Sequence, residues 1–156
     1  MRFILLLLGL LPLQVLAQIQ IDFESADLSE WTFSAAGRWD ISADRALNGA
    51  YSLVHIFDNP EAGNDMASIS LNGLQPGMGF CRWEFKLRHA FDPSSQNRWG
   101  VFITSDKDAV RMSPGADIRA YALGVNLKGS DDTLRLWKLF DGELKETITT
   151  NIITEI

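Results

Sequence analysis

The stretch that decides the fold is Cys81-Arg82-Trp83-Glu84-Phe85-Lys86-Leu87-Arg88, in which apolar and charged residues alternate without a break. Because successive side chains of a β-strand point to opposite faces, this pattern predicts an antiparallel strand with one face in the core and one in solvent. We therefore expect Trp83, Phe85 and Leu87 in the core. Cys81, the single cysteine, is expected beside them as a small buried hydrophobe. The alternative roles for Cys81 are a nucleophile or a link between two chains.

The same strand periodicity recurs along the chain. Half-buried strands are predicted where apolar and polar residues alternate, at Ile19 to Phe23, Trp39 to Ser42 and Ala67 to Leu71. More fully buried strands are predicted where both faces are apolar, at Tyr51 to Phe57, Trp99 to Ile103 and Leu134 to Phe140. A further strand is expected within Ala120 to Leu127.

Turn signals rich in Gly, Pro, Asn and Asp separate these runs at short intervals, and only Asp27 to Trp31 and Asp106 to Val110 look briefly helical. Many short strands with regular turns predict an all-β fold, a two-sheet antiparallel sandwich of the jelly-roll type. Besides the residues named above, we expect the core to contain Leu53, Ile69, Leu123 and Val125.

The last residues predict another strand pair, at Leu144 to Thr150 and Asn151 to Ile156. A sandwich that ended there would leave a long unpaired edge, which invites aggregation. We therefore expect the domain to be truncated at its C-terminal end, to lack its last strand or strands, and to be the first part of a longer polypeptide.

The first residues have the layout of a secretory signal peptide. Arg2 supplies a positive charge, an apolar run follows from Phe3 to Leu11, and Val15-Leu16-Ala17 places small or compact residues before a cleavage point. The run is shorter than the roughly 20 residues that span a bilayer. We expect residues 1–17 to be a signal peptide and residues 18–156 to form the β-sandwich domain. The protein is then secreted or at the cell surface, with no membrane span.

Charge limits the classes of partner. The chain has 14 basic and 20 acidic residues, a formal net charge of −6 at pH 7. Nucleic acids are bound largely through Lys and Arg that neutralise phosphates, so the acidic balance argues against a nucleic-acid partner. It argues equally against anionic lipid surfaces. With one cysteine, no disulfide forms within the chain, and packing must hold the fold.

Two ordered series of motifs carry a family resemblance. The first comprises Asp22-Phe23-Glu24-Ser25, Leu28-Ser29-Glu30-Trp31, Trp39-Asp40-Ile41-Ser42 and Asn48-Gly49-Ala50-Tyr51-Ser52-Leu53; the second runs from Tyr121 to Trp137. Together they resemble the N-terminal concanavalin-like or galactose-binding-like jelly-roll domains of large secreted bacterial surface proteins, some of which carry lamin-tail-like modules. The resemblance implies a domain type. It implies no single activity, because jelly rolls host many.

The opening Phe-Glu and the Gly-x-Tyr-Ser-Leu pattern are also similar to carbohydrate-binding modules of the jelly-roll type. In those modules a structural calcium lies between the first strand and the loop before the Tyr-Ser-Leu strand. That resemblance implies one structural calcium as the only cofactor, with Glu24 supplying carboxylate oxygens and Asn48 a side-chain or backbone oxygen. The usual further acidic ligand comes from the last strand, which we expect this chain to lack. The alternative is that Glu24 only starts a turn.

No constellation of residues predicts catalysis. A glycosidase needs two carboxylates flanking the scissile bond, and Glu84 stands alone between two basic residues, where a cross-strand charge partner is the simpler role. His55 and His89 are the only histidines. His55 shares its side of a strand with apolar residues, which predicts a core position. No Gly-x-Ser-x-Gly motif occurs. We therefore expect a non-catalytic domain.

Aromatic residues give the candidate binding site. Sugar-binding modules stack flat rings on pyranose faces and bind the hydroxyl groups with nearby polar side chains. Trp99 follows a long loop and has Arg98, Asn97 and His89 as polar neighbours, while core packing is the alternative role for Trp99. We expect a binding or structural module of a larger surface protein, with a glycan or a cell-surface protein as partner. The alternatives are the targeting module of an extracellular hydrolase whose catalytic domain lies beyond residue 156, and a protein–protein adhesion module.

Overall fold

Short strands account for all the regular structure that the computed structural model describes, which covers residues 18–44, 46–58, 63–74, 80–113 and 115–148. They are β1 (Trp31–Phe33), β2 (Trp39–Ser42), β3 (Ser52–His55), β4 (Ala67–Ile69), β5 (Trp99–Ser105), β6 (Ala120–Val125), β7 (Leu134–Phe140) and β8 (Glu143–Ile148). No helix occurs in these ranges, and every strand pair is antiparallel. The predicted all-β antiparallel class is confirmed, and the fold is consistent with a β-sandwich.

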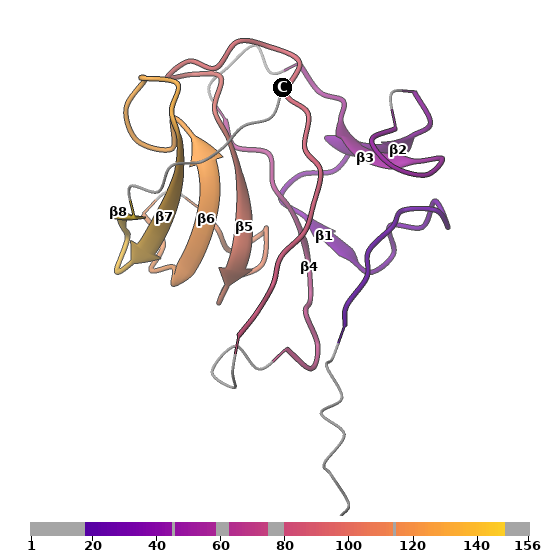
Figure 1. Ribbon diagram of the computed structural model, residues 1–156, viewed down its shortest axis with the longest axis horizontal. Coiled ribbons are helices and arrows are strands. Elements are labelled where there is room, and N and C mark those ends of the chain that lie inside the picture. Colours follow the sequence, from indigo (N-terminus) through magenta and orange to yellow (C-terminus); the bar gives the residue numbers. More distant parts are fainter. Residues whose placement is uncertain (1–17, 45, 59–62, 75–79, 114, 149–156) are drawn as a thin grey trace, which may run out of the picture.

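The described strands form three sheets. β1 pairs with β4, β2 pairs with β3, and β5, β6, β7 and β8 pair in that order. Figure 1 shows the four-stranded sheet on one side of the molecule and the two short pairs on the other. Each neighbouring pair in the large sheet follows the order of the chain, and a tight turn at Asp141 and Gly142 joins β7 to β8. The sequence predicted β2 and β7 with the observed bounds.

Several of the best-buried side chains lie on one face of the large sheet. Ala120 and Ala122 of β6 are 5% and 0% exposed, and Trp137 of β7, opposite Ala122, is 4% exposed. The small residues leave room for the indole ring, whose Nε1 donates a hydrogen bond to the Gly124 carbonyl at 3.3 Å. The core cluster on this face contains Met112, Ile118 and Ala120, with Met66, Phe102, Ala116 and Leu139 packed against it.

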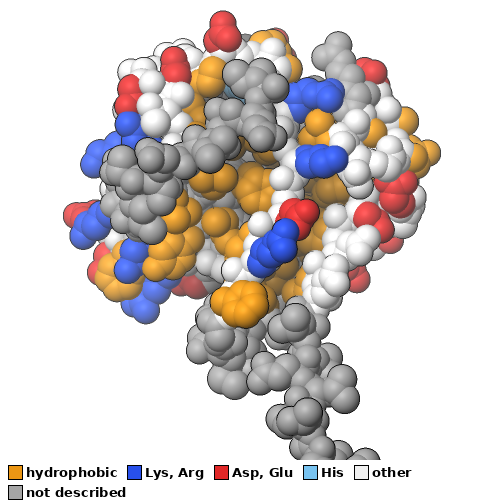
Figure 2. Space-filling model, viewed as in Figure 1, with side chains coloured by type: hydrophobic (Ala, Val, Ile, Leu, Met, Phe, Trp, Pro, Cys, Tyr) orange, Lys and Arg blue, Asp and Glu red, His pale blue; other side chains and the backbone are white. Residues whose placement is uncertain are grey.

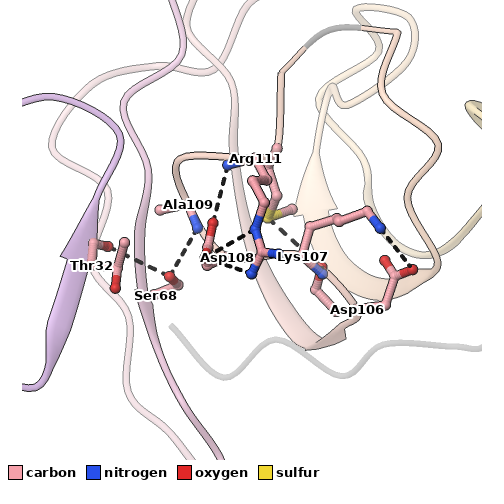
Figure 3. A network of polar contacts seen from close by, with 9 residues as sticks. Thr32, Ser68, Asp106, Lys107, Asp108, Ala109 and Arg111 are labelled. Atoms are coloured by element: carbon pink, nitrogen blue, oxygen red, sulfur yellow. Dashed lines mark hydrogen bonds and ion pairs between the residues drawn. The ribbon is translucent and has the colours of Figure 1, made fainter.

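Polar contacts join the two sides of the molecule (Figure 3). The Ala109 amide, in the turn after β5, donates to the Ser68 hydroxyl of β4 at 2.9 Å. That hydroxyl lies 3.5 Å from the Thr32 carbonyl of β1. In the same turn Asp108 accepts from the backbone and the guanidinium of Arg111. The turn after β5 is therefore fixed both internally and to the β1–β4 pair.

The segment that suggested the fold does not form the predicted strand. Residues 81–88 have no strand assignment and pair with no described strand, and their side chains are exposed. Trp83, Phe85 and Leu87 are 38%, 44% and 46% exposed, so their predicted core positions are wrong. Cys81 is exposed as well, against expectation. The physical reason is that a strand buries its apolar face only when neighbouring strands or a second layer cover it.

Other expectations are corrected or confirmed as follows. Residues 19–23 form no strand, and His55 is exposed instead of in the core. Leu53, Ile69 and Leu123 are half-buried, whereas Val125 is fully buried as predicted. No helix forms at Asp27 to Trp31, where a turn at Ser29 and Glu30 leads into β1, or at Asp106 to Val110, which form bends and a turn. The predicted signal peptide (1–17) and the strand at 151–156 lie outside the described residues. No helix long and apolar enough to cross a membrane is found among the described residues.

Candidate functional site

The loop before β5 is held in shape by its own polar groups. The Ser94 hydroxyl accepts from the Asn97 amide at 2.8 Å, and the Ser94 amide donates to the Asn97 carbonyl at 3.0 Å. The Asn97 side-chain amide donates to the Asp92 carbonyl at 3.0 Å. Asn97 was predicted as a ligand-binding residue, and its side-chain nitrogen instead closes the loop that presents Arg98 and Trp99.

Three rings follow one another at the end of this loop. The His89 ring lies 6.2 Å from Trp99 and 6.4 Å from Phe91, measured between centroids. We call Phe91, His89 and Trp99 the aromatic row. Phe91 is 72% exposed, while His89 and Trp99 are half-buried. The structure thus brings together two predicted site residues, His89 and Trp99, and adds Phe91, whose position two residues after His89 was the available signal.

The roles of His89 and Trp99 in the aromatic row differ from that of Phe91. The Nδ1 atom of His89 is buried and has no hydrogen-bond partner among the described residues. A ligand at the surface cannot reach this buried nitrogen directly. Trp99 is fixed in β5 opposite Val125. Phe91 therefore offers the accessible stacking face.

Arg98 connects the aromatic row to the loop before β4. Its exposed guanidinium donates to the Asn64 side-chain oxygen at 3.3 Å. A guanidinium has five N–H groups in a planar fork, so one such bond orients it without exhausting its donors. Asn64 was not identified in the sequence, because nothing in its surroundings indicates that a residue 34 positions away reaches it.

Next to Asn64 lies a compact charged cluster that sequence reasoning also missed. Asp65 accepts from His55 Nε2 at 2.8 Å and lies 3.6 Å from Arg38 Nε. The Arg38 guanidinium covers the Phe57 ring at 3.3 Å from its centroid, and the His55 ring lies 5.0 Å from that of Trp39. The Asp65 carboxylate is therefore engaged by two basic side chains. None of the hydrogen bonds found among the described residues links a hydroxyl or a thiol to His55.

The residues expected to hold calcium converge on one turn. The Glu24 carboxylate accepts from the Ala50 amide at 3.0 and 3.1 Å and from the Tyr51 amide at 3.3 Å. The Asn48 side-chain oxygen accepts from Lys86 Nζ at 3.4 Å. Gly49 has a positive φ of 68°, and a Cβ there would collide with the Glu24 carboxylate.

The contacts of Glu24 and Asn48 decide whether these residues could hold the expected calcium ion. Calcium takes six to eight oxygen ligands, and within the described ranges no group of three or more His, Cys, Asp or Glu side chains is placed to hold a metal. The Glu24 and Asn48 oxygens are already used by N–H groups and by an ammonium group. As arranged, these residues do not fit a calcium centre. Calcium at this turn stays a prediction that would require Lys86 to leave Asn48.

A separate hollow of about 460 Å³ opens at the β6–β7 end of the large sheet. Its lining residues are Lys128, Gly129, Ser130, Asp131, Arg135, Trp137 and Leu144. The Arg135 guanidinium donates two hydrogen bonds to the Asp131 carboxylate, of 2.6 and 2.5 Å, and lowers the pKa of that carboxyl to about 2. The hollow is therefore dominated by an ion pair whose two charges already satisfy each other. Trp137 is too buried to stack on a ligand there.

The aromatic row with Arg98 and Asn64 is thus the site whose chemistry is most open to a ligand. It offers ring faces for stacking and amide and guanidinium groups for hydrogen bonds. No protein-family model matches the chain, and neither do any of the curated proteins or solved structures with which it was compared.

Proposed function

We propose that this chain is a secreted, non-catalytic β-sandwich module of a larger cell-surface protein and that it binds carbohydrate at the aromatic row. The observation that carries the proposal is the ring series Phe91, His89 and Trp99, in which Phe91 is 72% exposed. The residue before Trp99, Arg98, donates a hydrogen bond to the Asn64 side chain. An exposed ring face is available to stack on a ligand. Pyranose rings present C–H faces that fit such a face.

The polar groups around the row support recognition of hydroxyl groups. Arg98 and Asn64 lie within hydrogen-bonding distance of each other, so the two side chains present donors and acceptors at one place. The hydroxyl groups of a neutral sugar can accept hydrogen bonds from the guanidinium and donate them to the amide oxygen. The sugar needs no charged group to bind such a pair.

The experiment that tests this proposal is a glycan-array screen of the full chain, followed by titration of the best glycan. Phe91→Ala is expected to raise the Kd several-fold, because an aromatic stacking contact contributes about 1 kcal/mol. Phe80→Ala is the matched control, since Phe80 is 83% exposed and outside the row. Its Kd should equal that of the wild type.

Two results would overturn the proposal. Absence of any glycan ligand would remove carbohydrate as the partner class. Equal effects of Phe91→Ala and Phe80→Ala would remove the aromatic row as the site. Trp99→Ala serves as a second variant: if it unfolds the domain, as circular dichroism would show, then Trp99 is a core residue and only Phe91 and Arg98 remain as binding residues.

Protein–protein adhesion is the second candidate function. It is favoured by a different observation, the exposed apolar side chains of Trp83, Phe85 and Leu87. Large exposed apolar patches are typical of sites of protein–protein interaction.

A further inference from the structure

The large sheet has two faces, and the core cluster lies on one of them. Ala122 of β6 is 0% exposed on this core face. Tyr121, its neighbour in the same strand, points to the opposite face and is 44% exposed. Leu123 and its partner Leu136 share the face of Tyr121 and are half-buried. The second face of the sheet is therefore apolar and partly open.

An apolar cleft of about 370 Å³ lies on this second face. Its lining residues are Cys81, Trp83, Ile103, Thr104, Tyr121 and Leu136. Three neighbouring strands, β5, β6 and β7, thus form the floor of the cleft, and residues 81 and 83 form one wall. Figure 2 shows hydrophobic side chains gathered in the middle of one side of the molecule. An apolar segment that covered the cleft would remove this surface from water, which is favourable.

The described part of the chain ends at the rim of this cleft. β8 ends at Ile148, whose backbone pairs with that of Leu136, and Leu136 lines the cleft. Eight residues, 149–156, follow β8 directly. An extended segment of that length spans roughly 26 Å, whereas three strand spacings, from β8 to β5, amount to roughly 14 Å. Residues 149–156 are therefore long enough to cross the sheet.

The sequence of residues 149–156 suits an apolar cleft. It reads Thr-Thr-Asn-Ile-Ile-Thr-Glu-Ile, with three isoleucines and one charged residue. In an extended segment alternate side chains share a side, so Ile152 and Ile156 lie on one side with Thr154. Ile153 and Glu155 lie on the other. The side of Ile152 is the one to be buried, because an unpaired carboxylate has to stay in water.

We propose that residues 149–156 of this same chain cross the second face of the large sheet and bury Ile152 in the apolar cleft. The connection to β8 favours this occupant over a separate molecule. A separate protein loses its translational and rotational freedom when it binds, whereas this segment is already joined to the sheet beside the cleft. The segment then supplies cover for a face that a layered β fold has to bury.

The single cysteine lies at the cleft and can report on the occupant. Residue 152, the fourth after β8, lies roughly 13 Å along an extended path, level with β5. Cys81 lines the cleft together with Ile103 of β5. A disulfide requires the two Cα atoms to lie within about 7 Å of each other, so its formation locates the segment.

Cross-linking of the protein produced from the full 156-residue chain tests the proposal. After oxidation, Ile152→Cys is expected to form a disulfide with Cys81 within one molecule. Ile153→Cys is the matched control, because its thiol lies on the outward side and should stay free. Non-reducing gels and counts of free thiols measure both variants. A disulfide that links two molecules only, or equal cross-linking of the two variants, would overturn the proposal.

Thiol labelling tests the same contact without a new disulfide. Cys81 is exposed, so its thiol reacts freely with a maleimide unless a segment covers it. In the wild type we expect labelling to be about tenfold slower than in the urea-unfolded protein, since access limits the reaction. Ile152→Asp should restore fast labelling and Ile153→Asp should not.

Circular dichroism shows whether these variants keep their strands, and the cross-link decides the outcome if Ile152→Asp unfolds the domain. Protection of Cys81 that grows with protein concentration would assign the cleft to a second copy. Wild-type labelling as fast as in urea would show that nothing covers the cleft. Either result would overturn the assignment to residues 149–156.

Discussion

β6 and the segment at residues 81–88 are both extended stretches of alternating sequence, but they differ in their surroundings. β6 has β5 on one side and β7 on the other, and its Ala122 is 0% exposed. The other segment has no described partner strand, and its Leu87 is 46% exposed. The comparison teaches that alternation decides which side chains share a face, whereas neighbouring strands decide whether that face is buried.

Truncating one aromatic residue in each region gives the largest expected contrast. Trp137→Ala removes a 4% exposed indole and its hydrogen bond to Gly124, and should lower the free energy of unfolding by about 3–5 kcal/mol. Phe85→Ala removes a ring that is 44% exposed and should cost well under half of that amount. Urea denaturation followed by tryptophan fluorescence and circular dichroism measures both.

The contrast would break if Phe85→Ala proved as destabilising as Trp137→Ala. Residues 81–88 would then be packed in solution as the sequence predicted, and the difference between the two regions would disappear.

A smaller effect is expected from added volume inside the large sheet. A Cβ at Gly124 of β6 would lie 2.6 Å from the Trp99 carbonyl oxygen and 2.9 Å from the Gly100 Cα. Backbone atoms of a paired strand cannot move aside easily, so Gly124→Ala should cost about 1–3 kcal/mol. At Gly100 the nearest atoms belong to the flexible Leu127 side chain, at 3.2 and 3.3 Å.

Gly100→Ala is therefore the matched control and should cost less than Gly124→Ala in the same denaturation assay. Equal costs would mean that the β5–β6 pair is packed less tightly than the structure has it, and the difference in packing between β6 and residues 81–88 would then be smaller.

The smallest expected effect on stability comes from two ion pairs. Asp131–Arg135 lies at the start of β7, and Arg82–Glu84 lies within residues 81–88. Arg135 holds the pKa of Asp131 at about 2, below its usual 3.8. A carboxyl whose pKa is lower in the folded state stabilises the fold above its unfolded pKa, and this contribution is lost as the pH falls from about 4 to about 2. The stability difference between wild type and Asp131→Asn should shrink over that range.

Arg82→Ala supplies the comparison, because it removes a strongly exposed pair and should leave stability nearly unchanged at neutral pH. Urea midpoints across the pH series measure both. A difference for Asp131→Asn that stays constant down to pH 2 would contradict the proposed role of Arg135.

Local patterns sufficed for the strands whose partners follow directly in the chain. β7 was predicted as Leu134 to Phe140 because both faces of this run are apolar, and turn residues bound it in the sequence. Residues 81–88 carry the clearer alternation, but nothing in their own composition states which strands lie beside them. Burial of Trp83 was therefore inferred from periodicity alone, and the exposure of its side chain shows the limit of that inference.

The candidate site was predictable in part for the same reason. His89 and Trp99 flank one loop, and their rings lie close together as expected. Asn64, which orients Arg98, comes from a different part of the chain. Asn97 was expected at the ligand because its side chain suits sugar hydroxyls. In the structure its side-chain amide donates to the Asp92 carbonyl, a contact that depends on the path of the backbone in the loop.

The Ser68 hydroxyl has a consequence for how the molecule opens. It accepts the amide of Ala109, which is 2% exposed, and it approaches the Thr32 carbonyl. Separating the β1–β4 pair from the turn after β5 would leave the buried Ala109 amide without its acceptor. Because an unsatisfied buried amide costs free energy, local opening of either the pair or the turn alone is disfavoured. One rotatable O–H group thereby ties the two-stranded β1–β4 pair, which is too small to persist alone, to the turn that follows β5.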